Sequence, residues 1–234
     1  MRISTPSLWL AFLMLLAVAA PDVVAQGNPR ITIFGGGSFL QGDRSFVVSG
    51  DNFTTEFITG GKLRARASLD LTSHWTLEAD YTFGRNNFRV NEMGTTPAQR
   101  DFGIRVNNVT LNLVRFFTAS ERRFRPYLGT GIGWVRYSPT DAAKNLALTG
   151  EFIGAPANLT ATNDFSIPFG GGIEFRFSRW LGTRIDVRDN ISRVARFGVP
   201  TTPSGPGGAF FPVDGITHNV QVEIGVVFFL KPKD

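Results

Sequence analysis

Apolar and polar residues alternate with a period of two over long stretches of this chain. From Lys62 to Leu71 the odd positions hold Leu or Ala, whereas the even positions hold Lys, Arg, Ser and Asp. A second run from Trp75 to Phe83 repeats the alternation, and only residues 72–74 separate it from the first. Successive side chains of a β-strand point to opposite faces, whereas a helix does not sort this pattern onto two faces. The two runs therefore predict two strands of a β-hairpin.

The same pattern predicts eight strands in all. They span residues 30–40, 62–71, 75–83, 104–117, 125–137, 164–177, 180–190 and 219–230. No amphipathic helical stretch of useful length lies between them. The resulting strand content is roughly twice that of an average globular domain, in which about 20–25% of residues are in strands. The chain is therefore predicted to be all-β.

The connections between these strands alternate in length. Residues 72–73, 118–124 and 178–179 form short links, whereas residues 41–59, 86–103, 138–163 and 191–216 form long ones, rich in Gly, Pro, Thr and Asn. In an up-and-down meander, all the long connections fall at one end, and both termini fall at the other. This asymmetry is typical of transmembrane barrels of the bacterial outer membrane. We therefore predict an eight-stranded antiparallel up-and-down transmembrane β-barrel with short periplasmic turns and four long extracellular loops.

The polar face of the predicted strands carries both signs of charge. Equal numbers of positive and negative side chains are expected where charges pair inside a narrow lumen, because an unpaired buried charge is costly. The opposite face has no charge in the middle of these strands, and it carries aromatic residues near their ends, as the girdles of membrane barrels do. Period alone leaves a soluble lipocalin-type barrel as an alternative, with the apolar face inside. The predicted lumen network consists of six bases and six acids: Lys62, Arg64, Arg66, Arg176, Arg184, Arg188, Asp70, Glu78, Asp80, Glu174, Asp186 and Glu223.

Glycines occupy alternate positions in the strand that begins at Arg125. Gly129, Gly131 and Gly133 share one face, and the opposite face carries Leu128, Ile132 and Trp134. The interior of an eight-stranded barrel is just wide enough for side chains, so these glycines are predicted to face inward and leave room for charged neighbours. A phosphate-binding loop is excluded, because no helix and no Gly-Lys-Ser/Thr sequence follows.

Residues 1–25 have the pattern of a cleaved export signal. Arg2 supplies the positive charge, residues 8–20 are apolar, and small or apolar residues precede the predicted cleavage after Ala25. The apolar run is short for a membrane anchor, which needs about 20 residues. Residues 26–234 are then predicted to form one exported barrel domain. The chain has no Cys and two His, so no metal site or cofactor is predicted.

Several short motifs resemble a known family. Residues 126–134 (PYLGTGIGW), 170–177 (GGGIEFRF), 184–189 (RIDVRD) and 218–229 (HNVQVEIGVVFF) look like those of the outer-membrane protein β-barrel domain family. That family is similar to the small eight-stranded barrels of the outer-membrane protein A, X and W types. The final strand also resembles the barrel-assembly signal, at Glu223, Gly225, Phe228 and Leu230. Residues 231–234 follow it, whereas many such proteins stop at a terminal aromatic residue.

The resemblance implies a bacterial outer-membrane protein, and the residues themselves indicate no enzymatic activity. Its partners would be outer-membrane lipids, lipopolysaccharide, the barrel-assembly machinery and an unidentified extracellular partner, with no nucleic acid. The first functional hypothesis is a structural or surface barrel with a charge-filled lumen and interacting loops. The alternative is a narrow pore or conduit for small, partly apolar solutes, and a soluble periplasmic lipocalin-like binder is the third.

Two groups of side chains are candidates for other chemistry. His74 and His218 are the candidate catalytic bases, with Asp214, Ser192 and Ser204 near the second of them in the sequence. No spacing demands such a site, so no catalytic residue is predicted. The cluster of Arg115, Arg122, Arg123 and Arg125 around the second short link is predicted to contact anionic lipid headgroups.

Overall fold

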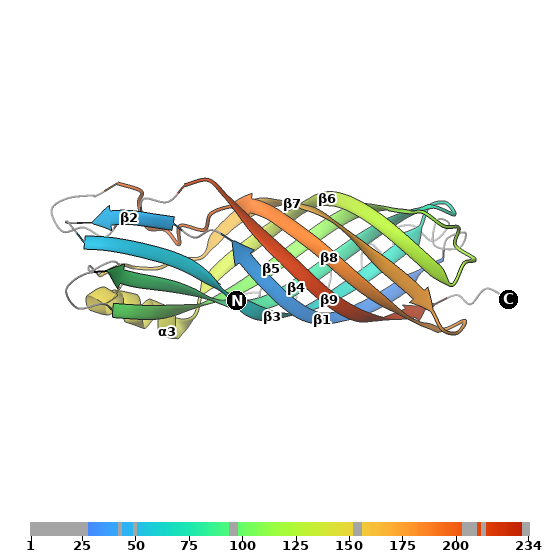
Figure 1. The fold of residues 1–234 in the computed structure, drawn as a ribbon, viewed down its shortest axis with the longest axis horizontal. Helices are drawn as coiled ribbons and strands as arrows, with labels where there is room; N and C mark the ends of the chain where they lie inside the picture. The colour runs from blue at the N-terminus through green and yellow to red at the C-terminus, as the bar shows by residue number, and fades with distance from the viewer. Residues whose placement is uncertain are drawn as a thin grey trace, which may run out of the picture.

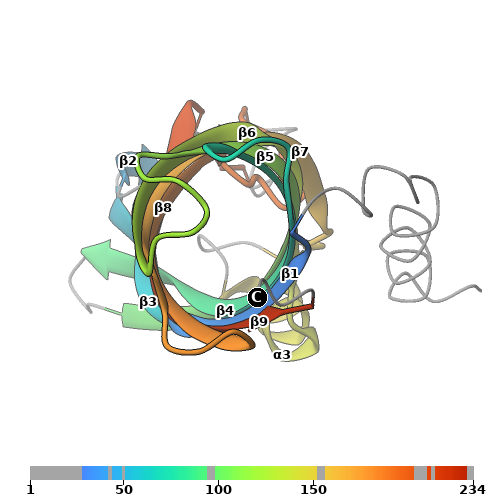
Figure 2. The ribbon, with the colours of Figure 1, turned by 90° about the vertical axis from the view of Figure 1, so that its right-hand side faces the viewer.

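The computed structural model describes residues 28–41, 44–48, 51–93, 98–151, 156–202, 210–211 and 214–230. The predicted export signal lies outside these residues. Nine strands form one antiparallel sheet in the order β1-β9-β8-β7-β6-β5-β4-β3-β2, and a further pairing of β1 with β3 closes it into a barrel. Figure 2 shows the closed ring along its axis. The strands are β1 (Arg30–Gln41), β2 (Arg44–Val48), β3 (Asp51–Asp70), β4 (Trp75–Met93), β5 (Ala98–Phe116), β6 (Phe124–Pro139), β7 (Thr162–Arg176), β8 (Leu181–Arg193) and β9 (Ile216–Phe229).

Eight of these strands form the barrel, which confirms the predicted fold, and β2 is an additional short strand that pairs only with β3. Every barrel strand pairs antiparallel with its sequence neighbours. The ends of the described chain meet, since the backbone N–H of Leu230 donates to the carbonyl of Pro29 at 3.0 Å. The barrel is long, and its strands are tilted to its axis (Figure 1).

The short connections lie together at one end, which we call the turn end. They comprise residues 71–74, 117–123 and 177–180. Two of them are stabilised by a hydroxyl that accepts backbone hydrogen bonds, a common device in tight turns. Thr72 Oγ1 accepts from the backbone N–H of Trp75 at 3.0 Å, and Ser178 Oγ accepts from that of Leu181 at 3.1 Å.

The opposite end, which we call the loop end, differs from the sequence expectation. Much of the segments 41–59 and 86–103 is strand, because β3 begins at Asp51, β4 continues to Met93 and β5 begins at Ala98. These extensions project beyond the rest of the barrel (Figure 1). A β-bulge between Ile58 and Gly61 shifts the register of β3 against β4 and so exchanges the faces of β3. These two long segments therefore contain strand residues where the sequence predicted only connections.

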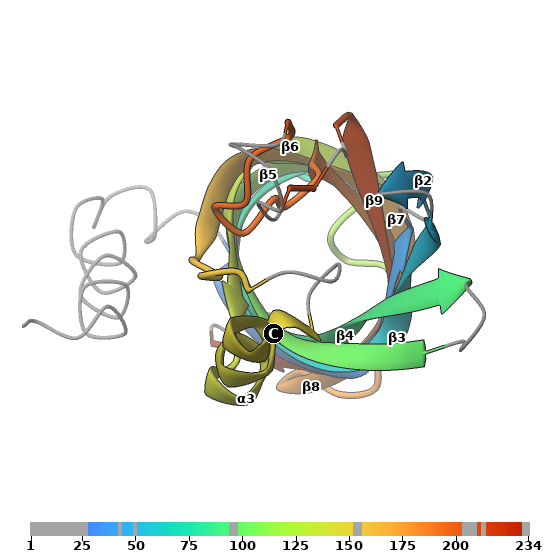
Figure 3. The same cartoon turned by 90° about the vertical axis from the view of Figure 1, so that its left-hand side faces the viewer.

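The remaining described loop-end segments lie around the rim of the barrel mouth (Figure 3). After β6 the chain forms a short helix, α3 (Asp141–Leu146), and a π-helical turn, η1 (Ala147–Glu151). Thr140 caps α3 by accepting a hydrogen bond from the backbone N–H of Ala143 at 3.2 Å. Residues 156–161 and 194–199 run beside each other, joined by a bond from the Thr160 N–H to the Phe197 carbonyl at 2.8 Å. No helix among the described residues has the length and apolarity needed to cross a membrane.

Candidate functional site

The interior of the barrel is the candidate functional site, and its turn-side part is a tier of buried charge. Eleven of the twelve predicted lumen residues lie there, each with 8% or less of its surface exposed. The exception is Arg176, which is partly exposed near the turn end, with its guanidinium carbon 3.7 Å from the centre of the Phe229 ring. We call the buried group the charged tier. Its predicted members are Lys62, Arg64, Arg66, Asp70, Glu78, Asp80, Glu174, Arg184, Asp186, Arg188 and Glu223.

Arg66 on β3 is central to the ion pairs of this tier. Its Nε and Nη2 atoms donate to the two carboxylate oxygens of Asp80 at 2.7 and 2.9 Å. Its Nη1 atom lies 3.2 Å from Glu78 on β4 and 3.2 Å from Asp186 on β8. Arg184 on β8 returns across the lumen to Glu78, at 2.6 Å. These pairs link opposite walls of the barrel, so the lumen is crossed by charge-assisted hydrogen bonds.

Sequence reasoning missed two members of the charged tier. Arg30 pairs with Asp70 at 2.8 Å, and Arg125 pairs with Glu174 at 3.2 Å. Placing Arg125 at the headgroup surface was wrong, because its side chain is buried and its guanidinium carbon lies 3.8 Å from the centre of the Phe116 ring. With both included, the buried bases of the described chain number seven against six acids. Arg125 shares the inward phase of Tyr127, which is the signal that could have identified it.

Glycines make room for this tier. A Cβ atom on Gly131 would overlap the carbonyl oxygen of Leu111, and one on Gly172 would overlap the phenol of Tyr127. The Tyr127 hydroxyl uses this space to donate to Asp186 at 2.7 Å. Leu128 and Ile132, on the opposite face of β6 from the glycines, are exposed on the outside of the barrel. The inward orientation of the β6 glycines is therefore as predicted.

A tier of neutral amides and hydroxyls lies above the charged tier, toward the loop end. Asn108 donates to Asn190 at 3.1 Å and accepts from Ser166 at 3.2 Å. Ser38 donates to Asn219 at 2.7 Å on the neighbouring strand. These side chains, from five different strands, are all buried. The interior thus changes from ionic to neutral polar along the barrel.

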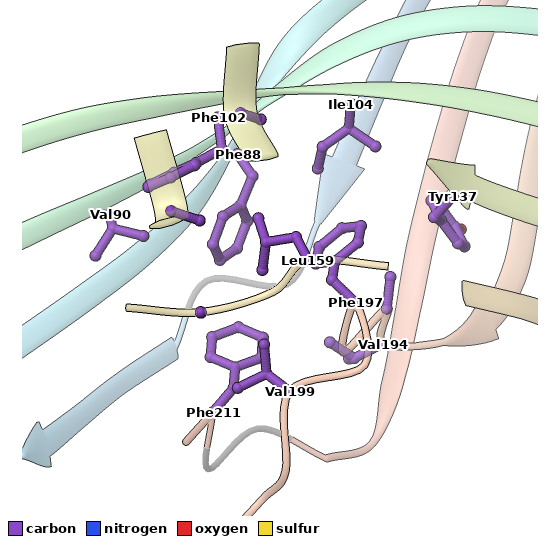
Figure 4. Close-up of a cluster of buried hydrophobic side chains, with 14 of the residues drawn as sticks. Phe88, Val90, Phe102, Ile104, Tyr137, Leu159, Val194, Phe197, Val199 and Phe211 are labelled. Atoms are coloured by element: carbon purple, nitrogen blue, oxygen red, sulfur yellow. The ribbon is translucent and has the colours of Figure 1, made fainter. Parts of the chain in front are cut away.

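The loop end is filled by a hydrophobic cluster, which we call the apolar cap (Figure 4). Phe88 on β4 packs against Phe57, Phe211 and Phe197, with ring centres 5.1, 5.6 and 6.3 Å apart. A cavity of about 10 Å³ beside Phe88 and Leu159 is about the size of one water molecule. The cap unites the strand extensions with the loop segments, and its buried members are Leu40, Phe53, Phe88, Val90, Phe102, Ile104, Val106, Val135, Tyr137, Ala143, Ala147, Ala157, Leu159, Val194, Ala195, Phe197, Val199 and Phe211.

The outer wall has the opposite polarity in the middle of the barrel. Leu63, Ile132, Phe169, Val187 and Ile224 are among many large apolar side chains exposed there. A continuous apolar surface of this kind is unusual for a soluble monomer and fits a hydrocarbon surrounding. The soluble lipocalin-type alternative is wrong, because it requires this face to be inside.

The predicted aromatic bands and the assembly signal have definite places on this wall. Trp75, Phe175 and Phe177 are exposed near the turn end, Phe165 is exposed nearer the loop end, and Tyr81 and Phe83 are partly exposed. On β9, Glu223 and Gly225 face inward, whereas Phe228 and the following Leu230 face outward. The role of these four residues as an assembly signal stays a prediction.

The candidate catalytic groups do not assemble into a site. His218 Nδ1 lies 2.6 Å from Asp189 on the outer face, whereas Ser192 faces the interior and shares a hydrogen bond with Tyr137 at 2.9 Å. His74 contacts its neighbour Ser73 at 2.8 Å in an exposed turn. Ser204 lies outside the described residues. Within the described part of the chain, no three His, Cys, Asp or Glu residues form a group that could hold a metal ion.

Comparison with known proteins finds a similar fold among solved structures. Solved structures similar to this chain include the outer membrane protein OprG from Pseudomonas aeruginosa, with 14% identity, a TM-score of 0.54, and coverage of 88% of this chain and 98% of that one. The N-terminal β-barrel domain of Pseudomonas aeruginosa OprF has 13% identity, a TM-score of 0.42, and coverage of 87% and 98%. Neisserial surface protein A has 10% identity, a TM-score of 0.48, and coverage of 86% and 97%.

No curated protein sequence matches the chain. The family model described as "Outer membrane protein beta-barrel domain" matches residues 8–228, which is most of the sequence. With its closed barrel and apolar outer wall, the chain belongs to the outer membrane protein β-barrel domain family and is an integral protein of the bacterial outer membrane.

Proposed function

We propose that this protein is a non-enzymatic structural or surface barrel that does not conduct ions, and that its loop end makes contacts outside the cell. The observation that carries the proposal is the charged tier. Arg66, Asp80, Glu78, Asp186 and Arg184 link β3, β4 and β8 across the lumen and are almost completely buried. A conducting pore needs a continuous column of water, and paired side chains occupy the space where that column would run.

The apolar cap supports the same proposal at the other end. Its described members pack closely, and Phe88, Phe102 and Leu159 enclose a cavity of about 10 Å³ between them. An ion crossing the barrel would have to enter this hydrocarbon and then part the ion pairs below it. Both steps are costly for a charge.

Conductance in planar bilayers tests this proposal. We expect the refolded protein to give no steady channel, while a wide porin reconstituted in the same way conducts. Leu148→Ala serves as a control variant. Leu148 is exposed in η1 outside the packed cap, so truncating its side chain should leave the conductance unchanged. A steady open channel of the wild-type protein would overturn the proposal.

The apolar lining of the loop end favours a second candidate, a conduit for small, partly apolar solutes. In that case the cap opens, and solutes pass between side chains such as Phe88, Phe102 and Leu159. The measurement is uptake of partly apolar solutes into liposomes that contain the protein. The conduit predicts faster uptake than in empty liposomes and sensitivity to substitution of Arg64 or Glu78. Uptake equal to that of empty liposomes counts against it.

The last strand supports a role in assembly by the barrel-assembly machinery. Phe228 and Leu230 are exposed on the outer face at the turn end, where another protein can reach them. Replacing both by Ser should slow barrel insertion in cells, whereas Ser at the exposed Ile216, at the other end of β9, should not. Equal insertion of both variants would argue against this role. The mass of the mature protein tests the predicted cleavage after Ala25, because that cleavage removes residues 1–25.

A further inference from the structure

Three arginines on neighbouring strands form a cluster on the outer wall near the loop end. Arg85 of β4, Arg105 of β5 and Arg136 of β6 are all exposed. Arg85 and Arg105 lie directly opposite each other across the β4–β5 pair. Arg136 lies diagonally next to Arg105, because it pairs with Asn107 on the same face of β5. We call these three residues the arginine patch.

The arginine patch lies at the edge of the apolar outer wall. On each of the three strands, its arginine is the first charged residue of the outer face on the loop side of the apolar band. On the turn side of each arginine, the outer face carries apolar or neutral residues. Phe83 lies next to Arg85 on β4, and Trp134 lies next to Arg136 on β6. On β5, Asn107 and then Val109 lie on the turn side of Arg105. The patch therefore sits where the hydrocarbon of a bilayer gives way to headgroups.

Within the described residues, no carboxylate forms an ion pair with the arginine patch. The acids of the same outer face are engaged higher up, where Arg89 is 2.7 Å from Asp101 and 3.1 Å from Glu56. Arg136 donates from Nε to Ser138 at 3.3 Å, which leaves its two Nη atoms available. The Arg85 guanidinium carbon lies 5.9 Å from the centre of the Phe83 ring. Like charges directly opposite on paired strands are destabilising, so this arrangement favours an anion that bridges them.

We propose that the arginine patch binds the phosphate groups of lipopolysaccharide in the outer leaflet. Guanidinium groups bind phosphate oxygens in a bidentate manner, and three of them on adjacent strands match a headgroup with more than one phosphate. The apolar wall just below, with Phe83, Trp134 and Leu111 exposed or partly exposed, offers a surface for the acyl chains of the same molecule. Anionic charge above hydrocarbon is the chemistry of this lipid. The inference rests on the proposed orientation, in which the loop end faces outward.

The turn end of the same strands provides the matched control. Arg115 of β5 is also exposed on the outer face, and its guanidinium carbon lies 5.7 Å from the Trp75 ring centre. No arginine lies directly opposite it, because its partners in the sheet are Trp75 and Leu128. Arg115→Gln thus removes an equivalent charge without touching the arginine patch.

The experiment measures binding of purified lipid A to the detergent-solubilised barrel. Native mass spectrometry compares lipid A that carries both phosphates with dephosphorylated lipid A. We expect the wild type to prefer the phosphorylated form, and Arg85→Gln/Arg105→Gln/Arg136→Gln to lose affinity by roughly a hundredfold, since each arginine near an anionic lipid surface contributes a factor of about five. Arg115→Gln should lose far less affinity than the triple variant.

Several results would overturn the inference. One is equal binding of phosphorylated and dephosphorylated lipid A, and another is unchanged binding by the triple variant. Inorganic phosphate is the third arm, because affinity for it as high as for lipid A would indicate a general anion site instead. If the triple variant does not fold, as judged by heat-modifiable gel mobility, Arg105→Gln and Arg105→Lys replace it, and Lys should retain more binding. A conducting wild-type protein, in contrast, would overturn only the proposal that the barrel does not conduct ions, and not the binding of lipid A by the arginine patch.

Discussion

The turn-side interior of the barrel is filled with ion pairs, whereas the loop end is filled with hydrocarbon. The β4 strand passes through both regions with one phase, since Glu78 and Asp80 face inward near the turn end and Phe88 and Val90 face inward near the loop end. The outer face of β4 changes in the opposite sense, from apolar residues such as Leu77 near the turn end to charged residues such as Arg89 near the loop end. The surroundings of the barrel explain this exchange. Lipid requires an apolar outer wall and so leaves the polar residues inside, whereas water beyond the membrane allows an ordinary apolar core.

The two regions also differ in what holds them together. Burial of apolar surface stabilises the apolar cap directly, by roughly 25 cal/mol per Å². The ion pairs of the charged tier must first offset the loss of water around each charge, so their net contribution is small. Removing one partner of a buried pair is nevertheless severe, because the other charge stays buried. The charged tier is therefore expected to be more sensitive to single substitutions than the apolar cap.

The largest effect is expected from Arg66→Leu. This change removes the buried cation with the shortest contacts shared by Asp80, Glu78 and Asp186, which keep only the longer shared contacts of Arg188 at 3.4–3.9 Å. Breaking a buried pair from one side lowers the free energy of unfolding by about 3–5 kcal/mol. Urea titration of the barrel in micelles, followed by gel mobility, measures the loss. Arg66→Leu combined with Asp80→Asn should recover part of it. A loss below about 1 kcal/mol, as for an exposed pair, would mean that water reaches the tier.

The next effect tests whether the apolar cap opens separately from the barrel. Leu159 lies in the segment before β7 and is 3% exposed, in contact with the cavity beside Phe88. Leu159→Ala should cost about 2–5 kcal/mol through lost burial and a larger void. We expect faster proteolysis and hydrogen exchange in the cap, while the urea midpoint of the barrel stays close to that of the wild type. Leu148→Ala, at an exposed position of η1, is the control. An equal fall in barrel stability would show that the regions unfold together.

A smaller effect is expected where a glycine gives the charged tier its space. The Cβ of Gly131→Ala would overlap the Leu111 carbonyl oxygen and the Asn112 side chain. Overpacking of this kind costs about 1–3 kcal/mol. At Gly61 an added Cβ has no atom within 4 Å, so Gly61→Ala is the matched control and should unfold as the wild type does. Equal urea midpoints for the two variants would mean that the interior near β6 is not tightly packed.

The barrel could be predicted from the sequence because alternation is a local signal. Its polar interior followed from the balanced charges of one face and the aromatic residues near the strand ends of the other. The phase of the strands from Lys62 onward gave the correct face for the residues of β3, β4 and β8. Arg125 was placed in the strand 125–137, but its closeness to Arg122 and Arg123 wrongly indicated a contact with lipid headgroups, although its phase matched that of Tyr127. Strand ends are ambiguous in this way whenever a charged turn adjoins a charged lumen.

The loop end could not be predicted in the same way. Beyond residue 85 the alternation of β4 continues, but polar residues such as Asn87 and Arg89 lie outside and apolar residues such as Phe88 lie inside. This reversal made the segment resemble a loop. The bulge between Ile58 and Gly61 interrupts the period of β3 as well. The packing of Phe88 against Phe197 and Phe211 joins residues more than a hundred positions apart, and no local pattern encodes such contacts.

The smallest effect separates an exposed ion pair from the buried ones. On the outer face of the strand extensions, the side-chain hydrogen bond from Arg89 holds the pKa of Asp101 below its usual value. A carboxylate whose pKa is lower in the folded state stabilises the fold above its ordinary pKa of about 4, and the stabilisation disappears as the pH falls through the folded value.

Asp101→Asn should therefore lower the urea midpoint slightly at neutral pH, and the difference from the wild type should vanish in acid. High salt should also reduce it, because the two side chains are 27% and 37% exposed and ions screen such pairs. The corresponding change in the charged tier, Asp80→Asn, should keep its larger effect in high salt if the barrel interior is closed to ions, as proposed. If salt weakened both effects equally, the lumen would be as accessible to ions as the outer surface, and the contrast between a sealed interior and a solvated rim would fail.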